Sequence, residues 1–290
     1  MRRKHCLKEL TIKDNFMFGA VMMDENNCKG FLERVLEMPI DRVEVSREKS
    51  IVYHPEYKGV RLDVYAKDEY RTHYNVEMQI EKKAAIGKRS RYYQSQMDME
   101  LLLTGEDYSE LPDTYVIFIC DFDPFGKEKY RYTFAMKCKE SKETNLEDGR
   151  KILFLNTHGK NEGEVPKELV TFLKYVKADL AGSEEEFHDP YVEQLQRFIR
   201  RIKESREMEE RFMIFEEMLK EERAEGREEG REEGRLEGYV NVLINVLQDI
   251  GEVPQSLREK IASEKKEEVL IAWAKLAAKA ASIEEFIQKM

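Results

Sequence analysis

The chain has 290 residues, of which 41% are hydrophobic and 37% are charged, and its formal net charge is −10. This length allows a sizeable hydrophobic core in one or two domains. The acidic balance excludes a protein that coats nucleic acid by bulk positive charge, although it leaves room for an enzyme with a local basic patch. With no signal peptide and no run of 18 apolar residues, we expect a cytoplasmic protein without a membrane partner.

The first part of the chain reads as an α/β core. Apolar periodicity and the turn residues between the periodic segments place its elements. In chain order we predict two short helices within 11–38, strands at 43–52, 60–67 and 73–81, a helix over 88–104, a strand at 114–120, and further strands within 129–140 and 151–157. The run TYVIFIC at 114–120 is nearly all apolar, which is typical of a buried central strand. Residues 1–165 are therefore predicted to form one domain.

The rest of the chain reads as helical. Residues 166–238 are predicted to be a helical, coiled-coil-like linker, because apolar residues from Val192 to Leu219 recur at steps of three and four with one gap. That seam favours packing on a partner helix, from the same chain or from a second copy. Residues 239–290 are predicted to form a small helical tail.

The stretch EGREEGREEGRLEG, residues 225–238, repeats every four residues and puts a glycine in each repeat. An interior glycine costs a helix about 0.8–1 kcal/mol relative to alanine. Two interpretations stay open. The glycine stripe lets two helices approach closely, or the segment is a solvated hinge.

Polar side chains recur on one face of a predicted hairpin within 61–83. Asp63 in the first strand and Glu77 and Gln79 in the second share the polar parity, whereas the even-numbered positions are apolar. That alternation is ordinary for an antiparallel hairpin with one face in water. With a turn centred on Tyr70, Asp63 falls opposite Glu77, and Arg61 falls opposite Gln79.

Two directly opposed carboxylates repel each other unless a cation lies between them. Mg²⁺ binds through one or two carboxylates and takes waters and substrate phosphate oxygens in its other positions. Asp63 and Glu77 are therefore candidate ligands for Mg²⁺, with Mn²⁺ as a substitute. The alternative is that both acids lie on an exposed strand face, where Arg61 neutralises them.

These residues resemble a known family. An Asp in one strand, a Glu-x-Gln in the next and a following helix resemble the PD-(D/E)XK nuclease superfamily. Several stretches are similar to its branch of PD-(D/E)XK nuclease family transposases, which resemble recombination-promoting nucleases. These stretches are GVRLDVYAKD, HYNVEMQIEK and RSRYYQSQMD, the opening TIKDNFMFGAVM, the run LLLTGEDYSELPDTYVIFICDFDPFG and the Gly-Arg-Glu repeat. The resemblance covers roughly residues 8–160 and the repeat. It implies a restriction-endonuclease-like core, with a mixed sheet flanked by helices, followed by a long helix and a small helical C-terminal region.

The resemblance also implies an activity. Asp63 matches the aspartate of the motif, Glu77 its acidic residue and Gln79 its lysine, which implies Mg²⁺-dependent endonuclease cleavage of DNA in recombination or transposition. Asp63 and Glu77 would hold a metal that polarises the phosphate and activates water, and the third side chain would orient that water or stabilise developing charge. Leu62 stands where the motif has proline. Gln79 brings no positive charge, which could come instead from Lys82, Lys83, Arg89 or Arg91.

Other residues are weaker candidates. Arg89, Tyr93 and Gln96 share one face of the helix after the hairpin, with Gln94 nearby. They either contact the metal site or a DNA phosphate, or they are core packing and solvated charges. Asp14 either adds a carboxylate to the site or caps the first helix.

Three functions follow from this sequence. The first is a metal-dependent DNA endonuclease, favoured by Asp63 and Glu77. The second is a catalytically inactive nuclease fold that works as an oligomerising nucleic-acid- or protein-binding module, favoured by the acidic charge and the missing lysine. The third is a ribonuclease or a toxin-like nuclease with the same site. A homodimer through the helical part would supply the two sites that a double-strand cut needs.

Overall fold

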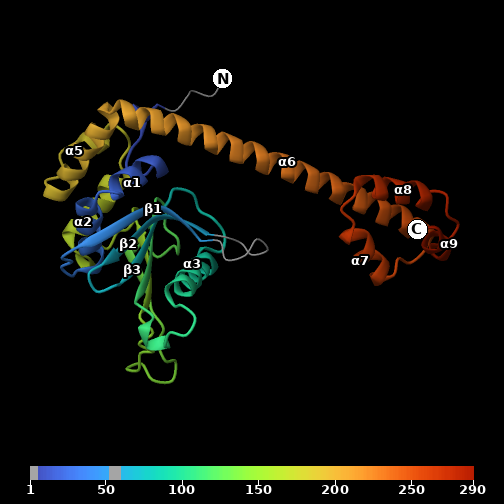
Figure 1. Cartoon of the computed structure of the whole chain (residues 1–290), viewed down its shortest axis with the longest axis horizontal. Coiled ribbons are helices and arrows are strands. Elements are labelled where there is room, and N and C mark those ends of the chain that lie inside the picture. The colour runs from blue at the N-terminus through green and yellow to red at the C-terminus, as the bar shows by residue number, and fades with distance from the viewer. Residues whose placement is uncertain (1–5, 52–59) are drawn as a thin grey trace. The chain divides into compact units, whose positions relative to one another are not determined.

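A computed structural model describes residues 6–51 and 60–290, with the side chains at 47–51, 60–61 and 229 outside the description (Figure 1). The chain divides into two compact units, Met1–Phe212 and Met213–Met290. Each is described by itself below.

The first unit is built on a six-stranded mixed sheet with the order β1-β2-β3-β4-β6-β5. Its strands are β1 (Val43–Ile51), β2 (Val60–Asp68), β3 (His73–Gln79), β4 (Thr114–Cys120), β5 (Arg131–Phe134) and β6 (Arg150–Asn156). Its α-helices are α1 (Asn15–Met22), α2 (Glu25–Leu36), α3 (Ile86–Leu101), α4 (Lys167–Lys177) and α5 (Pro190–Glu204). Short 3₁₀ turns lie at η1 (Leu7–Glu9), η2 (Tyr108–Glu110), η3 (Glu162–Glu164) and η4 (Gly182–Glu184). The predicted α/β core with a mixed sheet is confirmed.

Strand direction brings three strand ends to one edge of the sheet. β3, β4 and β6 run parallel, and their last residues Gln79, Cys120 and Asn156 lie in register. The carboxyl ends of parallel strands share one edge, so the segments that follow them also meet there. β1, β2 and β3 pair antiparallel on one side, and β5 closes the other side antiparallel to β6.

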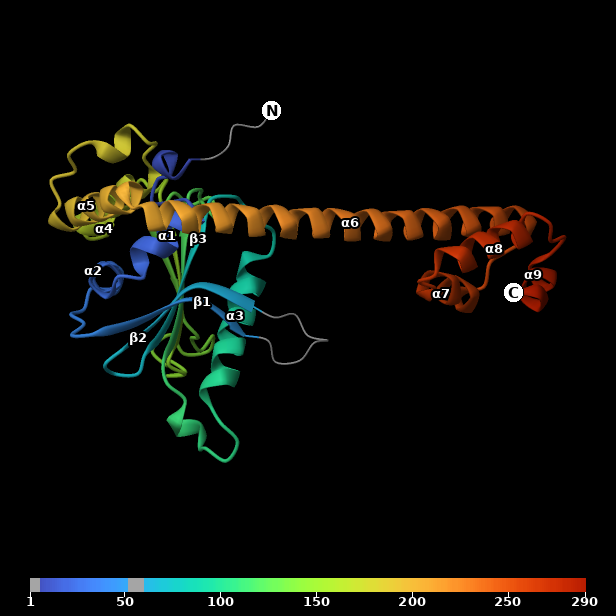
Figure 2. The same ribbon diagram turned by 45° about the horizontal axis from the view of Figure 1, so that its top comes forward.

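Helices cover both faces of this sheet (Figure 2). Helix α3 lies on one face, and α1, α2, α4 and α5 lie on the other. Every residue of β3 and of β4 is buried. The hairpin therefore differs from the expected form with one face in water, because α3 covers the polar face of β3.

The first unit extends past residue 165, where we placed the end of the core domain. The ring of Tyr191 in α5 packs so closely on Gly30 in α2 that a Cβ there would lie 2.6 Å from the ring. The Tyr191 hydroxyl donates to the carbonyl of Asn27 at 2.6 Å, and the Arg34 guanidinium lies 4.1 Å from the ring centre. These contacts join α5 to the helices that cover the sheet.

Several predicted boundaries shift. α3 spans Ile86–Leu101 instead of 88–104, and the strand expected within 129–140 is limited to Arg131–Phe134. Residue 52, the predicted last residue of the first strand, lies outside the described residues. The first of the two helices predicted within 11–38 begins at Asn15. The Asp14 carboxylate accepts a hydrogen bond from the Thr11 amide at 2.6 Å, which turns the chain before the helix.

The second unit is helical throughout its elements. Helix α6 (Arg206–Ile250) begins in the first unit, where the Phe212 ring meets that of Phe16 at 5.1 Å between centres. Its last turns pack with α7 (Gln255–Ser263), α8 (Glu267–Ala277) and α9 (Ile283–Lys289) around a core that includes Leu243, Leu247, Ile261 and Phe286. The predicted long helix and small helical end are confirmed. The glycine repeat is helical without a break.

Candidate active site at the end of the hairpin

The β2–β3 hairpin has the predicted register. Val64 pairs with Val76 and Tyr65 with Asn75, so Asp63 and Glu77 are the next pair. Around that pair, backbone amides bond to side-chain carboxylates of the opposite strand. The Asp63 amide donates to Glu77 Oε1 at 3.2 Å, and the Met78 amide donates to Asp63 Oδ2 at 3.4 Å. Each carboxylate is thus held by an amide of the opposite strand.

Arg89, in the first turn of α3, joins this pair to Gln79. Its Nη2 donates to Glu77 Oε2 and its Nη1 to Gln79 Oε1, each at 2.8 Å. Its Nε donates to the Tyr93 hydroxyl, also at 2.8 Å, and its guanidinium lies 5.4 Å from the ring centre of Phe118 in β4. The positive charge beside Gln79 is therefore that of Arg89.

The site is buried, and two opposing electrostatic effects act on the pKa of Glu77. Glu77 is 1% exposed. Its burial, together with the nearby Asp63 carboxylate, raises the pKa of Glu77, and the Arg89 guanidinium opposes that rise. Burial favours a neutral Glu77, whereas a cation beside it favours the carboxylate.

The structure brings together five of the predicted site residues, namely Asp63, Glu77, Gln79, Arg89 and Tyr93. Lys82 and Arg91 are exposed residues on either side of the start of α3.

Gln94 and Asp14 are not brought to this group. Gln94 donates to the carbonyl and the hydroxyl of Thr114, at the opposite end of β4 from the site. Asp14 precedes α1, and its carboxylate bonds back to Thr11 without capping the helix.

Sequence reasoning missed two polar groups near this edge. Asn75 lies two residues before Glu77 on the same face of β3 and is fully buried, and its side-chain amide acts to lower the pKa of Glu77. Asp121 directly follows β4; its amide donates to the Gln79 carbonyl at 2.9 Å, and its carboxylate pairs with Lys13 at 3.0 Å. The sequence feature that could have identified Asp121 is its position as a polar residue directly after a buried apolar strand.

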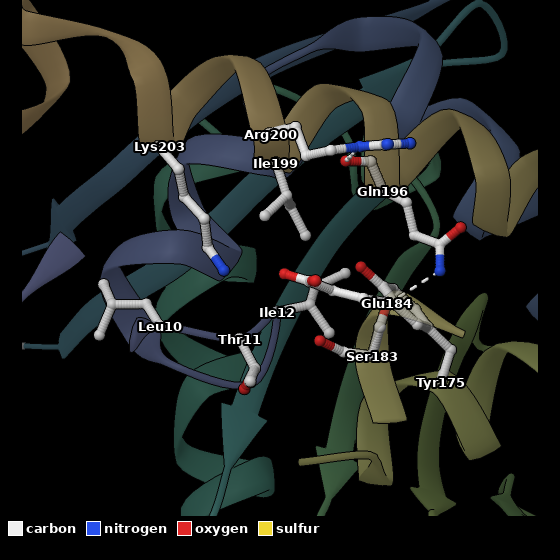
Figure 3. Close-up of a pocket in the computed structure, with 10 residues that line it drawn as sticks. All are labelled: Leu10, Thr11, Ile12, Tyr175, Ser183, Glu184, Gln196, Ile199, Arg200 and Lys203. Atoms are coloured by element: carbon white, nitrogen blue, oxygen red, sulfur yellow. Dashed lines mark hydrogen bonds between the residues drawn. The ribbon is translucent and has the colours of Figure 1, made fainter. Parts of the chain in front are cut away.

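A cavity of about 130 Å³ lies elsewhere in the first unit (Figure 3). Leu10, Thr11 and Ile12 form one side, and Ile199, Arg200 and Lys203 of α5 form another. Figure 3 shows Glu184 facing the space between these two groups. None of the candidate site residues lines this cavity.

The donors at the hairpin suit a hard divalent cation. Within the part of the chain that the structure describes, no group of three or more His, Cys, Asp and Glu side chains could hold a metal. Mg²⁺ needs fewer, because it uses one or two carboxylates together with waters and substrate phosphates. Asp63 and Glu77 fit that requirement, and Gln79 is linked to Glu77 through the Arg89 guanidinium.

A six-stranded mixed sheet flanked by helices, followed by a long helix and a small helical end, is consistent with a nuclease-type α/β fold of the PD-(D/E)XK kind. The family model described as PD-(D/E)XK nuclease family transposase matches residues 14–235. The chain belongs to this family. No curated protein and no solved structure is significantly similar to it. Among the described residues, no helix has the length and apolar character needed to cross a membrane.

Proposed function

We propose that this protein is a metal-dependent endonuclease that hydrolyses phosphodiester bonds in DNA. Membership in a nuclease family supports a nuclease- or transposase-like role. The observation that carries the finer proposal is the reciprocal bonding of Asp63 and Glu77 across the hairpin, with Arg89 fixed to both Glu77 and Gln79. Such a preorganised arrangement of charge is what phosphoryl transfer requires.

In this proposal Asp63 and Glu77 hold Mg²⁺, or Mn²⁺ in its place. The ion would act as a Lewis acid on the phosphate and lower the pKa of a bound water. Arg89 supplies the positive charge that the missing lysine would bring, because its guanidinium lies beside Gln79. In the proposed reaction this charge stabilises the negative charge that develops on the phosphate. Gln79 holds the guanidinium in position through its carbonyl oxygen and donates its amide to the Met78 carbonyl at 2.8 Å.

A local basic patch supports binding of a nucleic acid despite the acidic net charge. Lys82, Lys83, Lys88 and Arg91 surround the start of α3, are exposed, and form no ion pair with a described residue. Exposed cations beside a carboxylate site provide contacts for the phosphates on either side of the cleaved bond.

We further propose that the protein is a cytoplasmic homodimer through α6 and that it acts in recombination or transposition of mobile elements. A Cβ added at Gly226, Gly230, Gly234 or Gly238 would meet nothing within 4 Å. This open stripe on a long helix, flanked by arginine and glutamate, suits close approach of the same helix from a second copy.

Plasmid nicking tests the endonuclease proposal. Wild-type protein is assayed in Mg²⁺, Mn²⁺ and EDTA beside Asp63→Asn, Glu77→Gln and a control, Glu168→Gln, at an exposed position at the start of α4. We expect metal-dependent cleavage by the wild type and by the control, and none by the two site variants. A folded wild type that cleaves under no metal condition overturns the proposal and favours the inactive binding module. Parallel assays on RNA test the ribonuclease alternative.

A further inference from the structure

Two exposed aromatic rings share a sheet face with the candidate site. Phe125 follows β4 and is 37% exposed, and Phe134 ends β5 and is 47% exposed. In the sheet register Glu77 pairs with Phe118, Phe118 with Phe154, and Phe154 with Tyr132. These four residues form one row across the sheet, and Phe134 follows Tyr132 by two positions on the same face.

The rings along this row are stacked on one another. The Phe118 and Phe154 rings are nearly parallel, with centres 5.2 Å apart and planes at 9°. The Phe125 ring meets the Phe154 ring edge-on at 5.0 Å, and the Phe134 ring does so at 5.7 Å. We call Phe125, Tyr132, Phe134 and Phe154 the aromatic platform. The buried Phe154 ring contacts both exposed rings, and Tyr132 is half-buried beside them.

The loop that carries Phe125 is fixed by a dense set of hydrogen bonds. One Asp123 oxygen accepts from the amides of Phe125 and Gly126, at 3.1 and 2.9 Å, and from the Tyr132 hydroxyl at 2.9 Å. The other accepts from the Glu128 amide at 2.7 Å. The loop therefore holds Phe125 in a defined position, which reduces the entropy lost when a ligand binds its ring.

The position of the platform points to its ligand. Three strand spacings separate Tyr132 from Glu77, about 14 Å, so a chain with its phosphate at the site reaches the platform within a few nucleotides. Lys127, in the same loop, is exposed and has no ion pair with a described residue. Aromatic faces beside an exposed cation are the elements that bind single strands, and stacking contributes about 1–3 kcal/mol per base.

We propose that Phe125 and Phe134 stack on unpaired bases of the nucleic acid, which makes single-stranded or branched DNA the preferred substrate. In a duplex the neighbouring bases cover each base face, and only an unpaired base offers one to a phenylalanine ring. This inference rests on the proposed nuclease function for the identity of the ligand.

Binding in EDTA tests the platform without cleavage. The full-length chain is titrated into a fluorescein-labelled single strand and into its duplex, and anisotropy is followed for wild type, Phe125→Ala, Phe134→Ala and Phe134→Leu. The control is Tyr70→Ala, which removes a 70% exposed ring at the turn between β2 and β3, far from the end of β3 that carries the site. We expect both alanine variants to bind the single strand about 5- to 100-fold more weakly, with Tyr70→Ala unchanged.

A second readout separates stacking from a structural role. A 2-aminopurine base in the single strand is quenched by an aromatic ring, so Phe134→Leu, which keeps apolar bulk, should lose quenching while its melting temperature stays near that of the wild type. Unchanged single-strand affinity in both alanine variants overturns the inference. So does equal weakening for single strand and duplex, or a change of oligomeric state in these variants, which would make the platform an interface between copies.

The two proposals fail in different ways. Glu168→Gln, the control of the cleavage assay, should bind the single strand as the wild type does, because Glu168 belongs neither to the platform nor to the candidate site. If the wild type cleaves nothing but the platform variants lose single-strand binding, the endonuclease proposal fails and the platform stands. If the wild type cleaves and these variants bind normally, the endonuclease proposal stands and the inference about the platform fails.

Discussion

Arg89 Nη2 lies 2.8 Å from Glu77 Oε2, and this ion pair joins the helix after the hairpin to the buried end of β3. The Glu77 side chain is 2% exposed and that of Arg89 is 26% exposed. Arg89 thus bonds the buried carboxyl group of Glu77 and keeps one side of its own side chain partly exposed. In the proposed reaction, that open side faces the phosphate.

Removing the guanidinium should abolish most of the cleavage. Arg89→Met leaves Glu77 without its cation and takes away the charge that stabilises the phosphate in the transition state. We expect a loss of about 10²- to 10³-fold in single-turnover cleavage. Arg91→Met, which removes an exposed arginine two residues along the same helix, is the control and should lose far less. Equal losses in both variants would show that Arg89 only contributes to general phosphate binding.

Restoring the lysine of the motif should destabilise this protein. Gln79 is 7% exposed and accepts from Arg89, so Gln79→Lys puts a second buried cation against the guanidinium. We expect the free energy of unfolding to fall by about 1–3 kcal/mol. In the double variant Gln79→Lys/Arg89→Gln, much of that loss should return. Urea denaturation of the four proteins gives the coupling energy, and purely additive effects would contradict a direct interaction between the two positions.

The raised pKa of Glu77 predicts a pH dependence of stability. In the metal-free protein the folded state keeps the Glu77 proton at pH values where the unfolded chain has lost it. The unfolded state then binds fewer protons, so this group makes the free energy of unfolding fall as pH rises above about 4.5. Urea midpoints in EDTA should decline less steeply with pH for Glu77→Gln than for the wild type. Parallel curves for the two proteins would show that Glu77 is ionised throughout.

Replacing a glycine of the stripe by alanine should stabilise the helix and weaken dimer formation. Gly230→Ala removes a helix penalty of about 0.8–1 kcal/mol, and the space around it in the single chain is open. If a second copy packs on the stripe, the added methyl costs about 1–3 kcal/mol at the contact, and dimerisation weakens by about 5- to 150-fold. Sedimentation velocity measures the association. Gly163→Ala, at another open position in the first unit, is the control, and unchanged association in Gly230→Ala would place any dimer contact elsewhere.

The sequence by itself determined the local part of the site. A hairpin register depends on a short turn and on alternation along two adjacent strands, so the residue pattern alone was enough to pair Asp63 with Glu77. The family resemblance rested on the same contiguous motifs. The long helix and the helical C-terminal end were also readable, because their periodicity extends over many residues.

Only the tertiary structure decided which distant residues join that pair. Helix periodicity placed Arg89 and Gln94 near each other, but the packing of α3 across β3 and β4 sends Arg89 to Glu77 and Gln94 to Thr114. Burial of the polar face of β3 also depends on that helix. The aromatic platform lies in the row of Glu77 because the strand order β3-β4-β6-β5 brings together segments far apart in the chain. The β4–β6 pairing in that order joins strands that are not consecutive in the sequence, and no local pattern of residues encodes it.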